Sequence, residues 1–223
     1  MLLPPLPPDA LARIDALLAP GRRVLLGLTG PPGAGKSTLA EALAARYGAR
    51  AQVVPMDGFH LANAELRRLG RAGRKGAPDT FDAVGYAALL ARARAQRPGD
   101  AAIYAPAFHR DIEEAVAGSI PIHAETTLLI AEGNYLLFDE GDWAGVRPLL
   151  DACWYVDGDD DLRLQRLVAR HEAFGRSPAD ARAWVAGTDE PNARRIAATR
   201  GRADHVFCWP GGQRAAVGAP YDP

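Results

Sequence analysis

The feature that most constrains the fold of this chain is the run Gly-Pro-Pro-Gly-Ala-Gly-Lys-Ser at residues 30–37. It has the spacing G-x-x-x-x-G-K-[ST], in which glycines let a loop curl so that its N–H groups converge on phosphates. An apolar run at 23–29 precedes it and a helical pattern at 36–47 follows. A buried strand, this loop and a helix N-terminus together predict a nucleotide-binding α/β domain.

Two side chains of this loop have distinct expected roles. Lys36 would place a positive charge on the β- and γ-phosphates, and the Ser37 hydroxyl can ligate Mg²⁺. A chance glycine-proline turn is the alternative, but Lys36 and Lys75 are the only lysines in the chain. Neither has the neighbours of the Asn-Lys-x-Asp motif expected of a guanine-specific switch, which disfavours a GTPase. We therefore expect ATP and Mg²⁺ as cofactors, with nucleotide contacts from Gly30, Gly33, Ala34, Gly35, Lys36, Ser37 and Thr38.

Strand-like and helix-like segments alternate along the rest of the chain. Further buried strands are predicted at 52–56, 127–131, 152–156 and 205–209, and helices at 61–69, 83–95 and 160–173. This alternation predicts a three-layer P-loop sandwich, a doubly wound parallel sheet of about five strands with a helical lid. Residues 103–122 fit a short hairpin or a loop. The sequence shows neither an internal repeat nor a low-complexity linker, so we expect a single domain over 1–223. This domain would include an N-terminal extension at 1–20, whose helix has Asp9 as its N-cap, and a lid at about 163–188.

Composition disfavours several classes of protein. The 223 residues carry a formal net charge of -1, without the basic excess of a nucleic-acid binder. No stretch approaches 18 uncharged apolar residues, and the proline-broken N-terminus lacks the basic region of a signal peptide. Cys153 and Cys208 form no metal or disulfide framework and are expected as small hydrophobes in core strands. We expect a cytoplasmic protein whose partner is a small molecule and that binds neither nucleic acid nor a membrane. A homo-oligomer is compatible with this expectation.

Asp57 follows the apolar run at 52–56 and so lies at the carboxyl end of a predicted strand. Open α/β sheets bind ligands at that edge. The carboxylate could accept the proton of an attacking hydroxyl or orient that hydroxyl. A turn-forming Asp57-Gly58 pair explains the same residues equally well from spacing alone.

Three further motifs occur in a fixed order: Asp57-Gly58-Phe59, Arg-Lys-Gly-Ala-Pro-Asp-Thr-Phe-Asp at 74–82, and Glu-Gly-Asn-Tyr at 132–135. Together they resemble the phosphoribulokinase/uridine kinase superfamily over residues 24–210, nearest to its pantothenate kinase-like and nucleoside kinase-like members. The resemblance implies ATP, Mg²⁺, phosphorylation of a small-molecule hydroxyl, and a base aspartate that matches Asp57. The acceptor-binding residues that we expect are Phe59, His60, Lys75, Tyr104, Arg110 and Tyr135.

Glu132 ends the apolar run at 127–131 and places a second carboxylate on the ligand edge. It resembles the family's Glu-Gly element. Three roles stay open for it: holding Mg²⁺ through water, contacting the acceptor, or a structural acid at a strand end.

The predicted helix at 160–173 carries Arg163, Arg166 and Arg170 at i, i+3 and i+7, with Leu164, Leu167 and Val168 on its core side. The resemblance implies an arginine-bearing lid that closes over the phosphates. We expect Arg170 to act in catalysis, Arg166 to bind nucleotide and Arg176 to be a further candidate, with a solvated arginine face as the alternative. His171 is expected to be an exposed neighbour of Arg170 and to have no catalytic role. The stretch Asp189-Glu190-Pro191-Asn192 is interpreted first as the start of a helix with Asp189 as N-cap, and contact of Asn192 with adenine is the second interpretation.

The acceptor remains open. The basic stretch 67–75 could attract an anionic acceptor, or it could be a solvated loop. Pantothenate kinases carry Tyr-x-His where this chain has Tyr104-Ala105-Pro106, so we expect pantothenate to be a poor acceptor. The sequence predicts an ATP- and Mg²⁺-dependent kinase for a nucleoside, sugar or pantothenate-like alcohol. A nucleotide-monophosphate kinase and a regulatory ATPase that acts on a protein partner are the alternatives.

Overall fold

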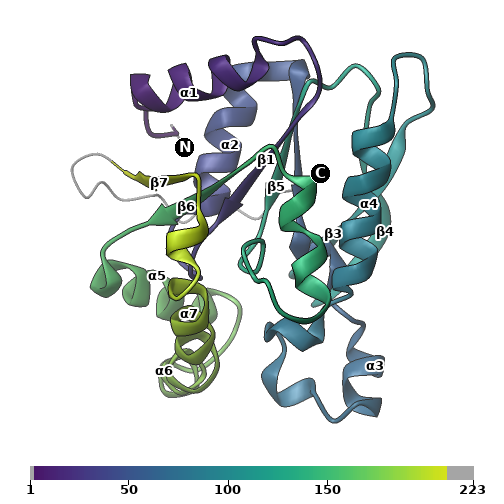
Figure 1. Cartoon of the computed structure of the whole chain (residues 1–223). Helices are drawn as coiled ribbons and strands as arrows, with labels where there is room; N and C mark the ends of the chain where they lie inside the picture. The colour runs from purple at the N-terminus through teal and green to yellow at the C-terminus, as the bar shows by residue number, and fades with distance from the viewer. Residues whose placement is uncertain (1–2, 210–223) are drawn as a thin grey trace.

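The computed structural model describes residues 3–209 and confirms the predicted α/β class (Figure 1). Its central sheet has five parallel strands, in the spatial order β2 (Ala51–Pro55), β5 (Leu128–Glu132), β1 (Val24–Thr29), β6 (Ala152–Asp157) and β7 (His205–Cys208). All six residues of β1 are buried, because layers cover both faces of the sheet. The neighbours β2, β5 and β1 end side by side.

Two hydrophobic cores fill the two faces of the sheet. On one face lie α1 (Pro8–Leu18) and α2 (Lys36–Tyr47), which bury Ile14 and Leu39 against the strands. On the other face lie α4 (Ala83–Ala95) and a separate hairpin of β3 (Ile103–His109) and β4 (Glu114–Ile122). Figure 1 shows these two layers on opposite sides of the sheet.

The segment 103–122 is a hairpin, one of the two structures predicted for it. Its register shifts between Ala105 and Ala107, at Pro106, which has no N–H to donate to the ladder. A Cβ built on Gly58 would lie 2.1 Å from the carbonyl oxygen of Pro106, so the two backbones pack directly. The hairpin therefore docks on the segment that carries Asp57.

The predicted lid region is helical except for a non-helical link at 174–177. It is formed by α5 (Asp160–Ala173), α6 (Pro178–Trp184) and a π-helical turn (Val185–Asp189), and α7 (Glu190–Ala197) follows it. The short helix α3 (Asn63–Arg68) lies at the same end of the molecule as α6 and α7 in Figure 1. Single 3₁₀ turns occur at Gly48–Arg50, Met56–Phe59, Ala72–Arg74, Pro78–Thr80, Gly141–Gly145, Arg147–Leu149 and Arg200–Arg202.

Several local predictions were wrong. The first helix begins at Pro8, so Asp9 lies in its first turn and does not cap it. Asp189 makes no capping bond either, because its backbone is helical and its carboxylate binds His171. Cys208 is exposed on the edge strand β7, whereas Cys153 is buried as predicted.

Of the predicted domain 1–223, residues 1–2 and 210–223 lie outside the described residues. Within 3–209, none of the helices is both long enough and apolar enough to span a lipid bilayer.

Candidate active site

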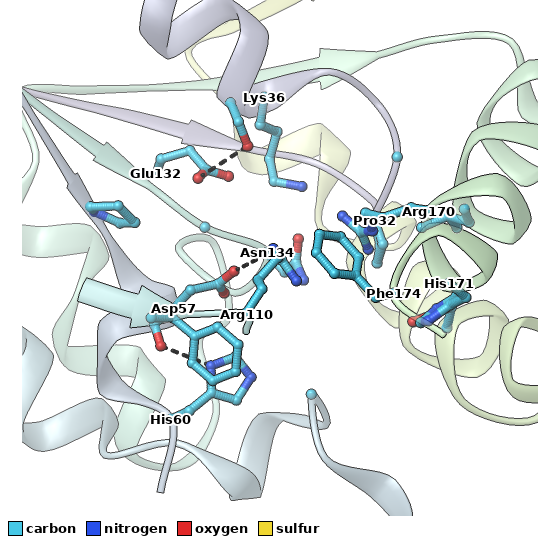
Figure 2. Close-up of a pocket in the computed structure, with 18 of the residues that line it drawn as sticks. Pro32, Lys36, Asp57, His60, Arg110, Glu132, Asn134, Arg170, His171 and Phe174 are labelled. Atoms are coloured by element: carbon cyan, nitrogen blue, oxygen red, sulfur yellow. Dashed lines mark hydrogen bonds and ion pairs between the residues drawn. The ribbon is translucent and has the colours of Figure 1, made fainter. Parts of the chain in front are cut away.

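A cavity of about 790 Å³ joins the motifs that are far apart in the sequence (Figure 2). The phosphate loop, the ends of β2 and β5, the turn of the β3–β4 hairpin and the end of α5 all contribute to its walls. The sequence-predicted residues that line it are Gly33, Gly35, Lys36, Ser37, Thr38, Asp57, His60, Lys75, Arg110, Glu132, Tyr135, Arg166, Arg170, Arg176 and Asn192.

The loop 30–37 forms one end of this cavity. Gly35 stands directly before α2 with φ 93°, a left-handed conformation that glycine adopts without strain. The Lys36 side chain is buried, and its Nζ donates to the carbonyl oxygen of Pro31, 3.1 Å away. Burial lowers the pKa of Lys36 to about 8, although the negative charges of Glu132 and Asp57 act to raise it. The loop thus presents a cation beside the α2 N-terminus, an arrangement that suits phosphate.

Two oxygen ligands suited to Mg²⁺ lie next to the lysine. The Ser37 hydroxyl donates to Glu132 Oε2 over 3.5 Å. Burial raises the pKa of Glu132 to about 7, although the charge of Lys36 opposes it. Among the described residues no cluster of three or more His, Cys, Asp or Glu side chains could hold a metal. A hydroxyl and one carboxylate fit Mg²⁺, which commonly takes its other ligands from phosphates and water.

Asp57 lies across the cavity, in the 3₁₀ turn after β2. Its Oδ2 is 3.5 Å from Nη2 of Arg110, which comes from the turn of the hairpin. Burial alone would raise the pKa of Asp57, but the positive charges around it, those of Arg110 and Arg170 among them, hold it below the usual value. Asp57 is therefore an ionised carboxylate that faces the cavity.

His60 packs beside Asp57. Its Nδ1 lies 2.8 Å from the Asp57 carbonyl oxygen, which can only accept, so Nδ1 donates. The ring lies between Phe81, at a centroid distance of 4.0 Å, and Phe108, at 4.6 Å. Burial lowers the pKa of His60, although Asp57 opposes this effect.

The turn of the hairpin is held by polar contacts from Asn63 and Lys75. Lys75 Nζ donates to Asn63 Oδ1 over 2.8 Å and to the Glu113 carbonyl oxygen. Asn63 also donates its backbone N–H to the Glu114 carboxylate over 3.0 Å. Glu113 has φ 53°, the only positive φ of a non-glycine residue within 3–209. These contacts fix the turn that presents Arg110 to the cavity.

The opposite wall comes from the end of α5. Arg170 lines the cavity, and burial lowers its pKa. Phe174, just after α5, turns its ring toward Asn134 in Figure 2 and lies 5.8 Å from the Arg110 guanidinium. Arg110 thus contacts both Asp57 and an aromatic ring from the lid region.

The comparisons with known proteins agree with this geometry. The family model "Phosphoribulokinase / Uridine kinase family" matches residues 25–186. The chain belongs to the phosphoribulokinase/uridine kinase family. It is 34% identical over 172 residues, 73% of this chain and 72% of the relative, to "Putative uridine kinase C227.14" of Schizosaccharomyces pombe. It is 35% identical over 182 residues, 79% of this chain and 74% of the relative, to "Uncharacterized protein YggC" of Escherichia coli K12.

A solved structure from Silicibacter sp. TM1040, described as a "putative fructose transport system kinase", superposes with a TM-score of 0.80 at 37% identity. The match covers 91% of this chain and 100% of that one. The chain is accordingly a P-loop kinase of the phosphoribulokinase/uridine kinase type, a class that phosphorylates small metabolites.

Four of the residues predicted to contact nucleotide or acceptor do not line the cavity. Tyr104 is 60% exposed, because it points outward from β3, where the inward positions 103 and 105 are buried. Phe59 packs on the Tyr86 ring in the core, at 5.1 Å. Gly30 packs against the Val156 carbonyl oxygen and Ala34 is buried, so both support the loop from behind.

The arginine face of α5 is divided in the structure. Arg163 is buried and pairs with Glu190 over 2.5 Å and Asp160 over 2.9 Å, so it joins α5 to α7. Arg166 and Arg170 line the cavity. The expectation that His171 is exposed was wrong, because its Nε2 contacts Asp189 Oδ2 over 2.8 Å and the side chain is half-buried.

Most arginines of the basic stretch 67–75 are paired with nearby carboxylates. Arg68 pairs with Glu65, while Arg71 and Arg74 pair with Asp79. None of these three arginines lines the cavity. The structure therefore agrees with the interpretation of this stretch as a solvated loop.

Sequence reasoning missed some of the residues that line the cavity. Asn134 stands inside the quoted motif 132–135, which was the available signal. Phe108 and Phe174 carry no such signal, because an aromatic residue near the end of a strand or helix more often belongs to a core. Their contacts with Arg110 depend on the docking of the hairpin and of α5.

Proposed function

We propose that this protein is a kinase that uses ATP and Mg²⁺ to phosphorylate a hydroxyl of a small metabolite. The observation that carries the proposal is that Lys36 and Asp57, one suited to phosphate and the other to a hydroxyl, line a single cavity. The residues proposed for nucleotide are those of the loop together with Arg166 and Asn192. Ser37 and Glu132 would hold Mg²⁺, which neutralises phosphate charge when it is bound.

The proposed transfer is an in-line displacement. The acceptor oxygen forms a bond to the γ-phosphorus, the bond from that phosphorus to the β,γ-bridging oxygen breaks, and ADP leaves. The hydroxyl proton passes to the Asp57 carboxylate, which is suited to accept it because neighbouring positive charges keep it ionised. Lys36 and Arg170 would stabilise the negative charge on the transferred group.

The names of the relatives support a sugar or nucleoside acceptor. One relative is named for uridine and the similar solved structure for fructose transport, and both compounds are polyhydroxylated. We include a cytoplasmic location and a small-molecule partner in the proposal, with neither nucleic acid nor membrane as a partner. A homo-oligomer is compatible with it.

Release of ADP tests this function. Purified protein with MgATP should produce ADP slowly, and one member of a panel of nucleosides, nucleotides, sugars, glycerate and pantothenate should accelerate it by at least about a hundredfold. The phosphorylated product should appear in equal amount. Acceleration by a macromolecule alone would favour a regulatory ATPase. A nucleoside monophosphate as the best acceptor would favour a nucleotide kinase.

A further inference from the structure

Polar contacts hold the Arg110 guanidinium only weakly. Within residues 3–209 the 3.5 Å contact with Asp57 Oδ2 is its only ion pair and its only side-chain hydrogen bond, although a guanidinium carries several N–H donors. Arg170 lines the same cavity, and burial and then the positive charge of Arg110 lower its pKa, so the two cations repel each other. Contacts of another kind must therefore keep Arg110 beside Asp57.

Two aromatic rings provide these contacts. The Cζ atom of Arg110 lies 5.8 Å from the ring centroid of Phe108 and 5.8 Å from that of Phe174, within the reach of a cation–π interaction. Phe108 belongs to the same hairpin as Arg110, whereas Phe174 follows α5. Figure 2 shows the guanidinium between the Asp57 carboxylate and the Phe174 ring. Phe174 is thus the contact that ties the position of Arg110 to the lid region.

The end of α5 holds Phe174 in a defined place. Gly175 follows it with φ 92°, the left-handed conformation that ends many helices, and the Arg176 N–H donates to the His171 carbonyl oxygen over 3.1 Å. The Arg176 guanidinium in turn lies 4.0 Å from the ring centroid of Trp184 in α6. Phe174 is nevertheless 46% exposed, so its ring lines the cavity and contributes little to a core.

We propose that Phe174 is a positioning residue for phosphoryl transfer, which holds the Arg110 guanidinium against Asp57 by stacking on it. This inference rests on the proposed kinase function and adds to it a role for a side chain that carries no charge and no hydrogen-bonding group. Without the ring, Arg110 would follow the repulsion from Arg170 and leave the carboxylate that orients the acceptor hydroxyl.

The first test removes the ring and keeps an apolar side chain. Phe174→Leu should lower kcat/KM for the best acceptor about fivefold, the equivalent of one cation–π contact, and leave the Kd for ATP unchanged. Phe174→Tyr keeps the ring and should retain most of the activity. Val84→Ala, at another exposed apolar residue that does not line the cavity, is the matched control and should retain full activity. A loss of ATP affinity that accounts for the whole effect would make Phe174 a nucleotide contact and overturn the inference.

The second test asks whether Phe174 acts through Arg110. Phe174→Leu should slow single-turnover transfer about fivefold in the unmodified protein and much less in the Arg110→Met variant, because the partner of the ring is then already absent. Such non-additivity supports the inference. Equal losses with and without Arg110 would show that Phe174 contributes only to local packing.

A spectroscopic measurement separates this inference from the proposed function, because it needs no turnover. The Nε–H signal of Arg110 can be identified in a ¹H–¹⁵N spectrum by its absence from Arg110→Met, and the currents of nearby aromatic rings shift it. Phe174→Leu should move this signal, and Val84→Ala should leave it in place. An unchanged signal in Phe174→Leu would contradict the inference whatever the activity. Absence of transfer to every compound by the unmodified protein would instead count against the proposed function.

Discussion

The guanidinium of Arg110 lies 3.5 Å from the carboxylate of Asp57, although the two residues are 53 positions apart in the chain. A tight charge-assisted hydrogen bond would be about 2.7–2.9 Å long. The longer separation lets Arg110 favour the ionised form of Asp57 while leaving carboxylate oxygen available for another donor. The relationship depends on the hairpin turn, which Lys75 and Asn63 hold in place.

Lys75→Met should weaken use of the acceptor without weakening ATP binding. Loss of the bonds to Asn63 and Glu113 frees the turn, so that Arg110 is no longer held at Asp57. We expect kcat/KM for the acceptor to fall about tenfold while the Kd for ATP, measured by calorimetry, stays unchanged. Lys75→Arg should recover part of the loss. Arg74→Met, which removes a surface pair with Asp79, is the control. An equal loss in that variant would count against the role of Lys75.

Lys36→Ala should abolish phosphoryl transfer in a folded protein. The amine faces the cavity from the first residue of α2, so its removal affects charge stabilisation in the transition state more than the core. Turnover should fall by at least about a hundredfold, measured as ADP formed with the best acceptor. Thermal unfolding serves as the control for folding. Near-normal turnover by the folded variant would contradict the assignment of the loop.

Arg170→Ala should lower kcat by about a hundredfold and change ATP affinity much less. The arginine lines the cavity near Asp57 and Glu132, where it can act on charge that develops during transfer. Separate measurement of kcat and of the Kd for ATP tests this. Arg182→Ala, at an exposed position of α6, is the matched control. A parallel loss of ATP affinity with no further loss in kcat would make Arg170 a ground-state contact.

Sequence patterns predicted the sheet and much of the site because local signals carry them. The buried apolar runs of β1, β5 and β6 and the spacing at 30–37 need no tertiary information. Strand ends in a parallel sheet share one edge, so Asp57 and Glu132 could be expected to lie together.

Other residues could not be placed without the fold. Whether Tyr104 faces the cavity depends on the register of the hairpin, because neighbouring positions on a strand point to opposite faces. Lys75 carries a charge that suits either a ligand or a structural contact, and only the docking of the hairpin shows that Asn63 and Glu113 bind it. Arg163 and Arg170 share a helical face in the sequence, but the position of Glu190 separates their environments.

Asp151→Asn should destabilise the fold in a pH-dependent way. Asp151 is 5% exposed and accepts from the Leu25 N–H over 2.8 Å and from Arg22 over 2.7 Å. Burial opposes ionisation, yet these bonds keep its pKa below the ordinary 3.8. A lowered folded-state pKa stabilises the protein above pH 3.8, and this contribution disappears as pH falls through the folded-state pKa.

Urea unfolding of the Asp151→Asn variant should therefore show a loss of about 1–3 kcal/mol at pH 7 and a smaller one as pH falls below the ordinary value. Asp142→Asn, at an exposed aspartate, is the control and should change stability little at either pH. A loss that is independent of pH would show that the charge of Asp151 contributes nothing.

Asp57→Asn is the sharpest test of the proposed chemistry, because it removes the charge and keeps the shape. Asparagine retains the size of aspartate and its preference for turns, so the 3₁₀ turn after β2 should persist. We expect a folded protein that binds MgATP but transfers phosphate at least about a hundredfold more slowly, the usual scale for general base catalysis. Part of that loss would come from weaker orientation of the acceptor hydroxyl.

Three separate measurements distinguish the possible roles of Asp57: the Kd for ATP, the Kd for the acceptor and the single-turnover rate. A base and orienting group predicts an unchanged Kd for ATP with a much slower single turnover. A residue that only forms the turn predicts that all three match the unmodified protein. In that case the base lies elsewhere. Glu132, whose pKa burial raises to about 7, is then the next carboxylate in the cavity to substitute.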